Sequence, residues 1–194
     1  NDPRTATCRV SNLDSTGFDL VLESTQSTTS QANHPPEEIS YFAVDASQLP
    51  DGVQAGKTTL SDANFHSVTF ASTQSPVAVA FVQTNNIELV NIRMQSLSST
   101  GFEITLDDLK VNSLSSDSIS NREVGGWIVI DKAVCNLGPE VEFGTILSVN
   151  HERKDITTST FAGPPTFVAT MNTVSGSDGS YLRGYQSSLN NQIS

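Results

Sequence analysis

The chain has 194 residues, with 21 acidic and 10 basic side chains and a net charge of −11. A surface this acidic is repelled by nucleic acid and by anionic lipid, which excludes both as natural partners. No apolar run approaches the roughly 18 residues of a membrane span, so we expect no membrane span. The acidic charge balance favours an extracellular or cell-surface location. The start, Asn1-Asp2-Pro3-Arg4, has neither Met nor a signal-peptide pattern, and we expect a processed chain or a piece of a longer one.

Apolar and polar residues alternate along the chain with the period of a β-strand. Such alternation places one row of side chains in a core and the other row toward water. A single helical turn at 46–49 is the most helix that the sequence predicts. Turn-forming Gly, Pro, Asn and Asp separate the runs at short spacing, which is typical of an all-β sandwich or barrel. The apolar rows are, in chain order, Phe18-Leu20-Leu22, Val77-Val79-Phe81, Phe102-Ile104-Leu106 and Phe167-Ala169-Met171, and the row Glu103-Thr105-Asp107 is expected to face water.

One motif, Ser-Thr-Gly-Phe, occurs at residues 15–18 and again at 99–102. Residues 8–23 align with residues 92–107 around the two copies. The aligned positions include Arg9 with Arg93, Gly17 with Gly101 and Phe18 with Phe102. We interpret the motif as a strand, a tight turn carried by Thr-Gly and a returning strand, in which the glycine supplies a positive φ.

Other segments of the chain also repeat. Residues 38–45 match residues 123–131, and the segment 76–84 after Phe70 matches the segment 165–173 after Phe161. Residues 63–131 therefore form one complete unit, residues 1–46 the back half of a second unit, and residues 137–194 the front half. The two halves could pair within one chain, the C-terminal half could complete the N-terminal half of the next chain, or the chain could be a fragment of a tandem array.

The ordered series of motifs in the complete unit resembles the H-type lectin domain, which is found in snail agglutinins and as tandem repeats in large bacterial surface proteins. The resemblance implies a six-stranded antiparallel β-sandwich, often trimeric, that binds N-acetylgalactosamine-type sugars. The predicted fold is thus all-β, with two six-stranded-type antiparallel sandwich units, one continuous and one split between the chain termini. The motifs that carry the resemblance are Ser67–Ser72, Pro76–Gln83, the Arg93 strand, Ser99–Phe102 and Val124–Ile130.

The sugar-binding positions of that family do not match here. The family Trp and polar ring residue fall on Leu109 and Lys110, the family Arg falls on Leu89, and Thr25 occupies the Trp position of the first half. Sugar sites usually combine an aromatic platform with a few fixed polar groups.

Four residues are candidates for contact with a glycan or a protein partner, namely Arg93, Asp107, Asp108 and Lys110. The alternative for the last three is a solvated hairpin tip. For Arg93, and for Arg9 at the matching position, the alternative is a solvent-facing charge paired across the sheet. Trp127, in an apolar run, is expected in the core.

The two cysteines, Cys8 and Cys135, form no CxxC motif and no Cys/His cluster, so we expect no zinc site. A disulfide between them, within one chain or between adjacent subunits, and a pair of unpaired thiols are both open. No catalytic motif surrounds Cys135, and we predict neither an enzyme nor a cofactor.

Two functional hypotheses follow. The first is a non-enzymatic extracellular structural protein, a subunit or repeat of a surface fibre. It would assemble head-to-tail with copies of itself through complementary β-strands, because incomplete units expose unpaired backbone groups. The alternative is a glycan-binding adhesin for galactosamine-type sugars, which rests on the family resemblance.

Overall fold

The computed structural model describes the chain in eight segments and two single residues, 6–24, 39, 41–84, 90–108, 122–138, 141–147, 156–157, 161, 168–171 and 192–193. The described part contains ten strands and no helix. All strand pairings in it are antiparallel, which confirms the predicted all-β class.

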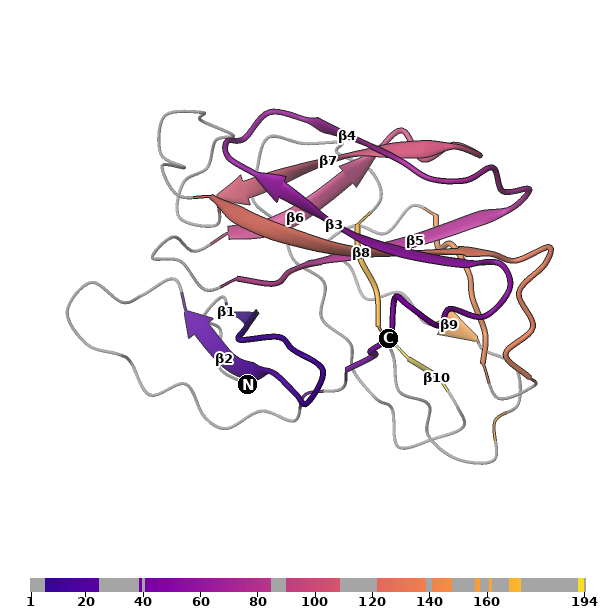
Figure 1. Cartoon of the computed structure of the whole chain (residues 1–194), viewed down its shortest axis with the longest axis horizontal. Coiled ribbons are helices and arrows are strands. Elements are labelled where there is room, and N and C mark those ends of the chain that lie inside the picture. The colour runs from indigo at the N-terminus through magenta and orange to yellow at the C-terminus, as the bar shows by residue number, and fades with distance from the viewer. Residues whose placement is uncertain are drawn as a thin grey trace.

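Two three-stranded sheets stack to form a sandwich at the centre of the molecule (Figure 1). One sheet has the order β3-β8-β5 and the other the order β4-β7-β6. β3 precedes residue 63, where the predicted unit begins, and it pairs with β8 along its whole length. The strands are β3 Val53–Leu60, β4 His66–Thr69, β5 Pro76–Val82, β6 Val90–Gln95, β7 Gly101–Asp108 and β8 Glu123–Asp131.

Two smaller pairs of strands flank this sandwich. The hairpin of β1 (Ala6–Ser11) and β2 (Asp19–Ser24) precedes it in the chain, and the short pair β9 (Ile156–Thr157) and β10 (Gln192–Ile193) follows it. In Figure 1 both pairs lie below the sandwich, the hairpin toward the left and β9–β10 toward the right. The described strands of the two terminal parts pair only within their own part.

The core lies between the two central sheets. The row predicted on β7 is confirmed, because Phe102, Ile104 and Leu106 are all buried. On β5 the side chains that enter the core are the smaller ones, Ala78, Ala80 and Val82. The predicted apolar row Val77, Val79 and Phe81 faces outward instead. The remaining core side chains are Leu60, Val68, Val90, Ile92, Met94 and Val129.

Trp127 on β8 is half-buried and packs against this core, as predicted. Its ring meets Phe102 edge-on, with centroids 6.0 Å apart. The indole N–H donates to Thr58 Oγ1 at 3.2 Å, which fixes the ring across β3. A Cβ on Gly56 would stand 2.3 Å from the Trp127 ring, so the glycine leaves the space that the indole fills.

The prediction that the second row of β7 faces water is wrong for Thr105 and Asp107, each only 1% exposed. The loop between β3 and β4 reaches this row, where the carbonyl oxygen of Ala63 accepts a hydrogen bond of 2.8 Å from Thr105 Oγ1. A strand covered on both faces carries polar side chains inside, and these then need partners.

The repeated Ser-Thr-Gly-Phe motif forms the same turn twice. In the first copy, Asp14 N–H donates to the carbonyl oxygen of Gly17 at 3.0 Å, and in the second copy Ser98 N–H donates to that of Gly101 at 2.9 Å. Both motifs join two antiparallel strands, β1–β2 and β6–β7. The predicted strand–turn–strand unit is thus confirmed.

The predicted role of the two glycines is wrong. Gly17 and Gly101 do not have positive φ; the residues that do are Asn12 (φ 51°) and Ser96 (φ 56°), at the start of each loop. Gly101 is needed for another reason, since a Cβ there would lie 2.5 Å from the carbonyl oxygen of Val68 on β4. Close approach of a neighbouring backbone is a usual reason for glycine in a strand.

Gly101→Ala is expected to destabilise the protein by about 1–3 kcal/mol, because the added methyl group forces β4 away from β7. The matched control is Gly17→Ala, since no atom of the described residues lies within 4 Å of a Cβ built there. Urea unfolding followed by tryptophan fluorescence measures both. Equal destabilisation by the two substitutions would contradict the steric explanation.

Candidate functional site

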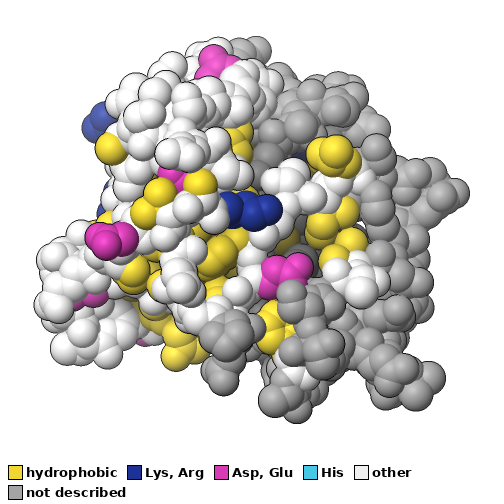
Figure 2. Space-filling view, turned by 90° about the vertical axis from the view of Figure 1, so that its right-hand side faces the viewer, with side chains coloured by type: hydrophobic (Ala, Val, Ile, Leu, Met, Phe, Trp, Pro, Cys, Tyr) yellow, Lys and Arg dark blue, Asp and Glu magenta, His cyan; other side chains and the backbone are white. Residues whose placement is uncertain are grey.

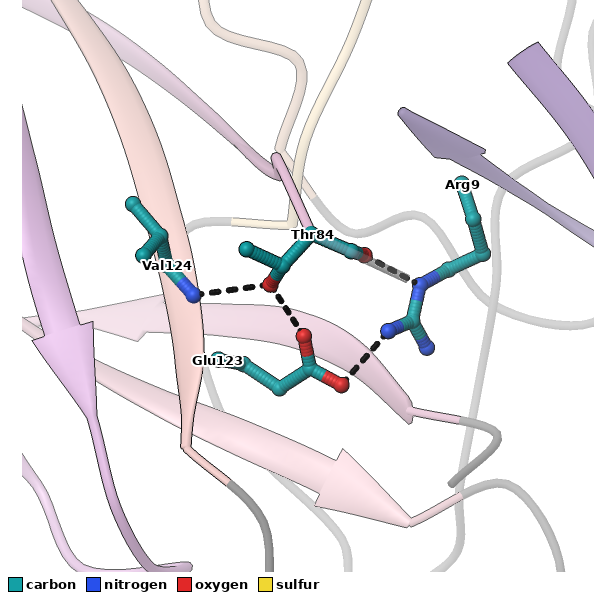
Figure 3. Close-up of polar contacts among 4 residues, drawn as sticks. All are labelled: Arg9, Thr84, Glu123 and Val124. Atoms are coloured by element: carbon teal, nitrogen blue, oxygen red, sulfur yellow. Dashed lines mark hydrogen bonds and ion pairs between the residues drawn. The ribbon is translucent and has the colours of Figure 1, made fainter. Parts of the chain in front are cut away.

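The candidate site is the joint at which the N-terminal hairpin meets the central sandwich. Arg9 of β1 and Glu123, the first residue of β8, are both fully buried and form an ion pair, with Arg9 Nη2 2.5 Å from Glu123 Oε1. Arg9 Nε also donates to the carbonyl oxygen of Thr84 at 3.0 Å. Figure 3 shows Arg9 reaching from β1 toward Glu123 and Thr84, which lie beside each other.

Local strand pairing holds the acceptors of this joint in place. Thr84 follows β5, and Gln83 N–H donates to the carbonyl oxygen of Val124 on β8 at 2.7 Å. Val124 N–H donates to Thr84 Oγ1 at 2.9 Å, and the same hydroxyl donates to Glu123 Oε2. Both carboxylate oxygens of Glu123 therefore have partners before solvent is considered (Figure 3).

The joint is a positioning device more than a source of net stability. Removing two charges from water costs free energy that their attraction repays only with good geometry and additional hydrogen bonds. Here one arginine accounts for an ion pair and a backbone hydrogen bond, and only one placement of the hairpin satisfies both. The arrangement fixes the hairpin relative to β5 and β8.

A second joint lies at the open edges of β5 and β6, which are neighbouring edge strands of the two sheets. Residues 168–171 bridge them. Met94 N–H donates to the carbonyl oxygen of Met171 at 3.2 Å, and Thr170 Oγ1 donates to that of Ala80 at 2.7 Å. The C-terminal part of the chain is thus attached to the central sandwich by backbone groups on both edges.

The structure brings two of the predicted contact residues together. Arg93 on β6 is 5% exposed, and its Nη1 donates to Asp107 Oδ2 at 2.9 Å. The predicted alternative of a solvated hairpin tip is therefore wrong for Asp107. The alternative of a charge paired across the sheet is confirmed for Arg93, which pairs with Asp107 on the neighbouring β7, but the expectation that Arg93 and Arg9 face solvent is wrong. Asp108 ends β7, its side chain lies outside the described structure, and Lys110 lies outside the described residues.

The two cysteines are free thiols in the structure, Cys8 exposed on β1 and Cys135 half-buried after β8. Burial and the nearby negative charge of Asp131 raise the pKa of Cys135. A disulfide between subunits through these thiols stays a prediction.

Sequence reasoning missed Glu123 and Thr84 as partners of Arg9. The signal was available in part, because Glu123 stands at the start of an apolar strand and aligns with Glu38 in the first half. A carboxylate next to a buried strand is expected to have a cationic or hydrogen-bonding partner. The choice of Arg9 among the cations follows only from the docking of the hairpin.

A small pocket of about 60 Å³ lies on the outer face of β5 and β8. Its lining comes from all three parts of the chain, with Phe42 before β3, Phe81 and Trp127 in the sandwich, and Val168 after it. Ligand pockets usually measure about 300–1,000 Å³, so this one is smaller than a sugar-binding pocket. It marks the place where the three parts meet.

Within the described residues, no group of three or more His, Cys, Asp and Glu lies close enough together to hold a metal ion. The same part of the chain contains no helix long and apolar enough to cross a membrane.

Asp131 ties the end of β8 to the loop before β5. Its carboxylate accepts hydrogen bonds from the backbone N–H groups of Gln74 (2.8 Å), Ser75 (3.0 Å) and Ala133 (3.0 Å). These donors, Gln74 above all, hold the pKa of the Asp131 carboxyl below its ordinary value. The charged form is the one that the fold stabilises.

A lowered pKa in the folded state stabilises the protein above the unfolded pKa, and this contribution is lost as the pH falls through the folded pKa. The midpoint of thermal unfolding is therefore expected to drop as the pH falls below about 4. Asp131→Asn is expected to lower the midpoint at neutral pH and to flatten its decline in acid. Asp51→Asn, at an exposed turn, is the control. A variant with the full acid dependence of the wild type would contradict the assignment to Asp131.

The fold and the two joints define an all-β protein in which one structural unit is used more than once. No family model matches the chain, and no solved structure matches it. The chain is similar to part of halomucin from Haloquadratum walsbyi, at 32% identity over 192 residues. The match covers 94% of this chain and 2% of halomucin, so the chain spans a very small part of that relative.

Proposed function

We propose that the chain is a non-enzymatic structural module of an extracellular or cell-surface protein, built from β-sandwich units that follow one another and lock together. The similarity to a small part of a protein named halomucin supports a place in a large surface protein. The net charge of −11 supports a solvated, exposed setting. We also propose that the repeated unit is related to the H-type lectin domain, which its motifs resemble.

The observation that carries the proposal is that the same two repeat elements meet at both joints. β1 aligns with β6, and its Arg9 donates to the carbonyl oxygen of Thr84, which follows β5. β6 in turn meets residues 168–171, whose sequence repeats β5. In each case, the strand that corresponds to β6 in one unit contacts the segment that corresponds to β5 in the following unit. Repetition of one joint along a chain produces a stiff, linear arrangement of units.

Surface labelling of intact producing cells tests the location. The chain is expected to react with a membrane-impermeant amine reagent through its exposed lysines, and a chain labelled only after cell lysis would overturn the proposal. Lys57 and Lys132 are exposed on the sandwich and provide two sites for the reagent.

A glycan array of the purified chain tests the adhesin alternative. A structural module is expected to give no saturable binding. Binding that free N-acetylgalactosamine abolishes would favour the adhesin.

A further inference from the structure

The N-terminal part repeats side-chain contacts of β6, β7 and β8 as well as the turn of the Ser-Thr-Gly-Phe motif. The side chain of Asn12 donates to Asp19 Oδ2 at 2.6 Å, as the side chain of Ser96 donates to Glu103 Oε2 at 3.0 Å. These four residues occupy aligned positions. The hairpin β1–β2 is therefore a second copy of β6–β7 in side-chain contacts as well as in backbone.

Residues 41–45 belong to no strand, but they repeat two contacts that β8 makes. The rings of Phe18 and Tyr41 meet edge-on at 5.3 Å, as those of Phe102 and Trp127 do at 6.0 Å. Asp45 begins a turn with Gln48 N–H donating to its carbonyl oxygen at 3.0 Å, and the aligned Asp131 accepts the matching bond at 3.1 Å from Val134 N–H. The N-terminal part thus repeats a turn, a ring contact and a hairpin of the back half of the central sandwich.

This back half is uncovered where the central one is buried. Leu20 is 42% exposed, whereas the aligned Ile104 is 0% exposed. Tyr41 is 67% exposed, whereas the aligned Trp127 packs between the core and β3. In the central unit the front strands supply the missing neighbours, and among them β3 pairs with β8 in the same sheet.

A segment after the sandwich repeats the sequence of β3. Val141-Glu142-Phe143-Gly144 aligns with Val53-Gln54-Ala55-Gly56, and residues 141–147 belong to no strand of the structure. Its side chains Val141, Ile146 and Leu147 are 40%, 38% and 73% exposed. The chain after β8 runs down the right-hand side of Figure 1, and Figure 2 shows that this side of the molecule carries groups of exposed hydrophobic side chains.

Two glycines lack, among the described residues, the close neighbour that their aligned counterparts have. Gly56 leaves room for the Trp127 ring, but no atom of the described residues lies within 4 Å of a Cβ built on the aligned Gly144. Gly101 leaves room for the backbone of β4, but no atom of the described residues lies within 4 Å of a Cβ built on the aligned Gly17. In both open positions the described residues lack the contact that the central unit makes.

We propose that residues 141–147 of one copy pair antiparallel with residues 41–45 of a second copy, as β3 pairs with β8. In the central register Gly56 lies opposite Trp127 and Val53 opposite Ile130. The same register places Gly144 under the Tyr41 ring of the second copy. This inference rests on the proposed structural role, and it names the partner as another copy of the chain.

Sedimentation of the whole chain over a range of concentrations tests the pairing. High salt is used because the net charge of −11 repels other copies. The wild type is expected to form a ladder of oligomers, and Gly144→Val and Tyr41→Ala are each expected to remain monomeric. Neither change alters a described contact across β3–β8, so thermal unfolding should show both variants folded. Ala71→Val, at an exposed position two residues after β4, is the control for an added apolar side chain and should associate like the wild type.

Mixing the two variants is the decisive measurement, because each has lost a different end. The intact 141–147 of Tyr41→Ala can still pair with the intact 41–45 of Gly144→Val. The mixture is therefore expected to give dimers and nothing larger. A monomeric mixture, or a Gly144→Val chain that associates like the wild type, would overturn the pairing. A wild type that stays monomeric overturns it too, while cell-surface labelling would still report on the structural role.

Discussion

Arg9→Met is expected to weaken the attachment of the N-terminal hairpin to the sandwich by about 3–5 kcal/mol, because it leaves the buried carboxylate of Glu123 without its cation. Arg9 and Glu123 are both 0% exposed, so water cannot replace the lost partner without opening the joint. Hydrogen exchange of the β1 and β2 amides, together with urea unfolding, measures the change. Exchange in β1 and β2 should accelerate more than exchange in the central core.

The matched control is Lys57→Met, which removes a positive charge at an exposed position of β3 and is expected to change stability by less than about 0.5 kcal/mol. The double variant Arg9→Met with Glu123→Met should recover most of the loss, because apolar side chains of similar size often replace a buried ion pair well. If Arg9→Met alone left exchange in the hairpin unchanged, the joint would not hold it.

The second large effect is expected at the centre of the core. Ile104→Ala should lower the free energy of unfolding by about 2–5 kcal/mol, since Ile104 lies in β7 between the two sheets and the deleted atoms leave a cavity. It is 0% exposed and its strand pairs with β4 on one side and β6 on the other. Urea unfolding with tryptophan fluorescence reports on it directly through the nearby Trp127.

The repeat offers a control at the aligned position. Leu20→Ala removes a side chain that is 42% exposed, and at concentrations where the chain is monomeric it should cost less than about 0.5 kcal/mol. Comparable losses at the two positions would mean that the N-terminal half is covered in solution, which the monomer structure does not show.

The sequence contained most of the information for the fold, because strand alternation and turn residues act locally. The β7 row from Phe102 to Leu106 was predicted as core, and it is core. The two Ser-Thr-Gly-Phe motifs predict one hairpin used twice, and each of their turns contains the same hydrogen bond at aligned positions. Local pattern did not identify β3, whose residues Val53–Leu60 alternate weakly and acquire their strand from pairing with β8.

For Gly101 the prediction that glycine is required was correct, but the predicted reason was wrong. Turn chemistry suggested positive φ at Gly101, but the constraint is the carbonyl oxygen of Val68 on a strand far away in the sequence. Such a steric limit follows from the approach of two backbones, which no local propensity encodes.

The sequence by itself determined most of the β-strands and the acidic surface, because each depends on residue type and on neighbours within a few positions, and comparing distant segments of it revealed the repeated unit. Only the tertiary structure decided that Arg9 and Arg93 are buried and which carboxylates they meet. Their burial depends on what covers the outer faces of the strands, and that is set by the docking of segments distant in the chain. A charged residue on a strand has the same local pattern whether water or another unit lies above it, and the low dielectric of the covered face then requires the specific partner that the fold provides.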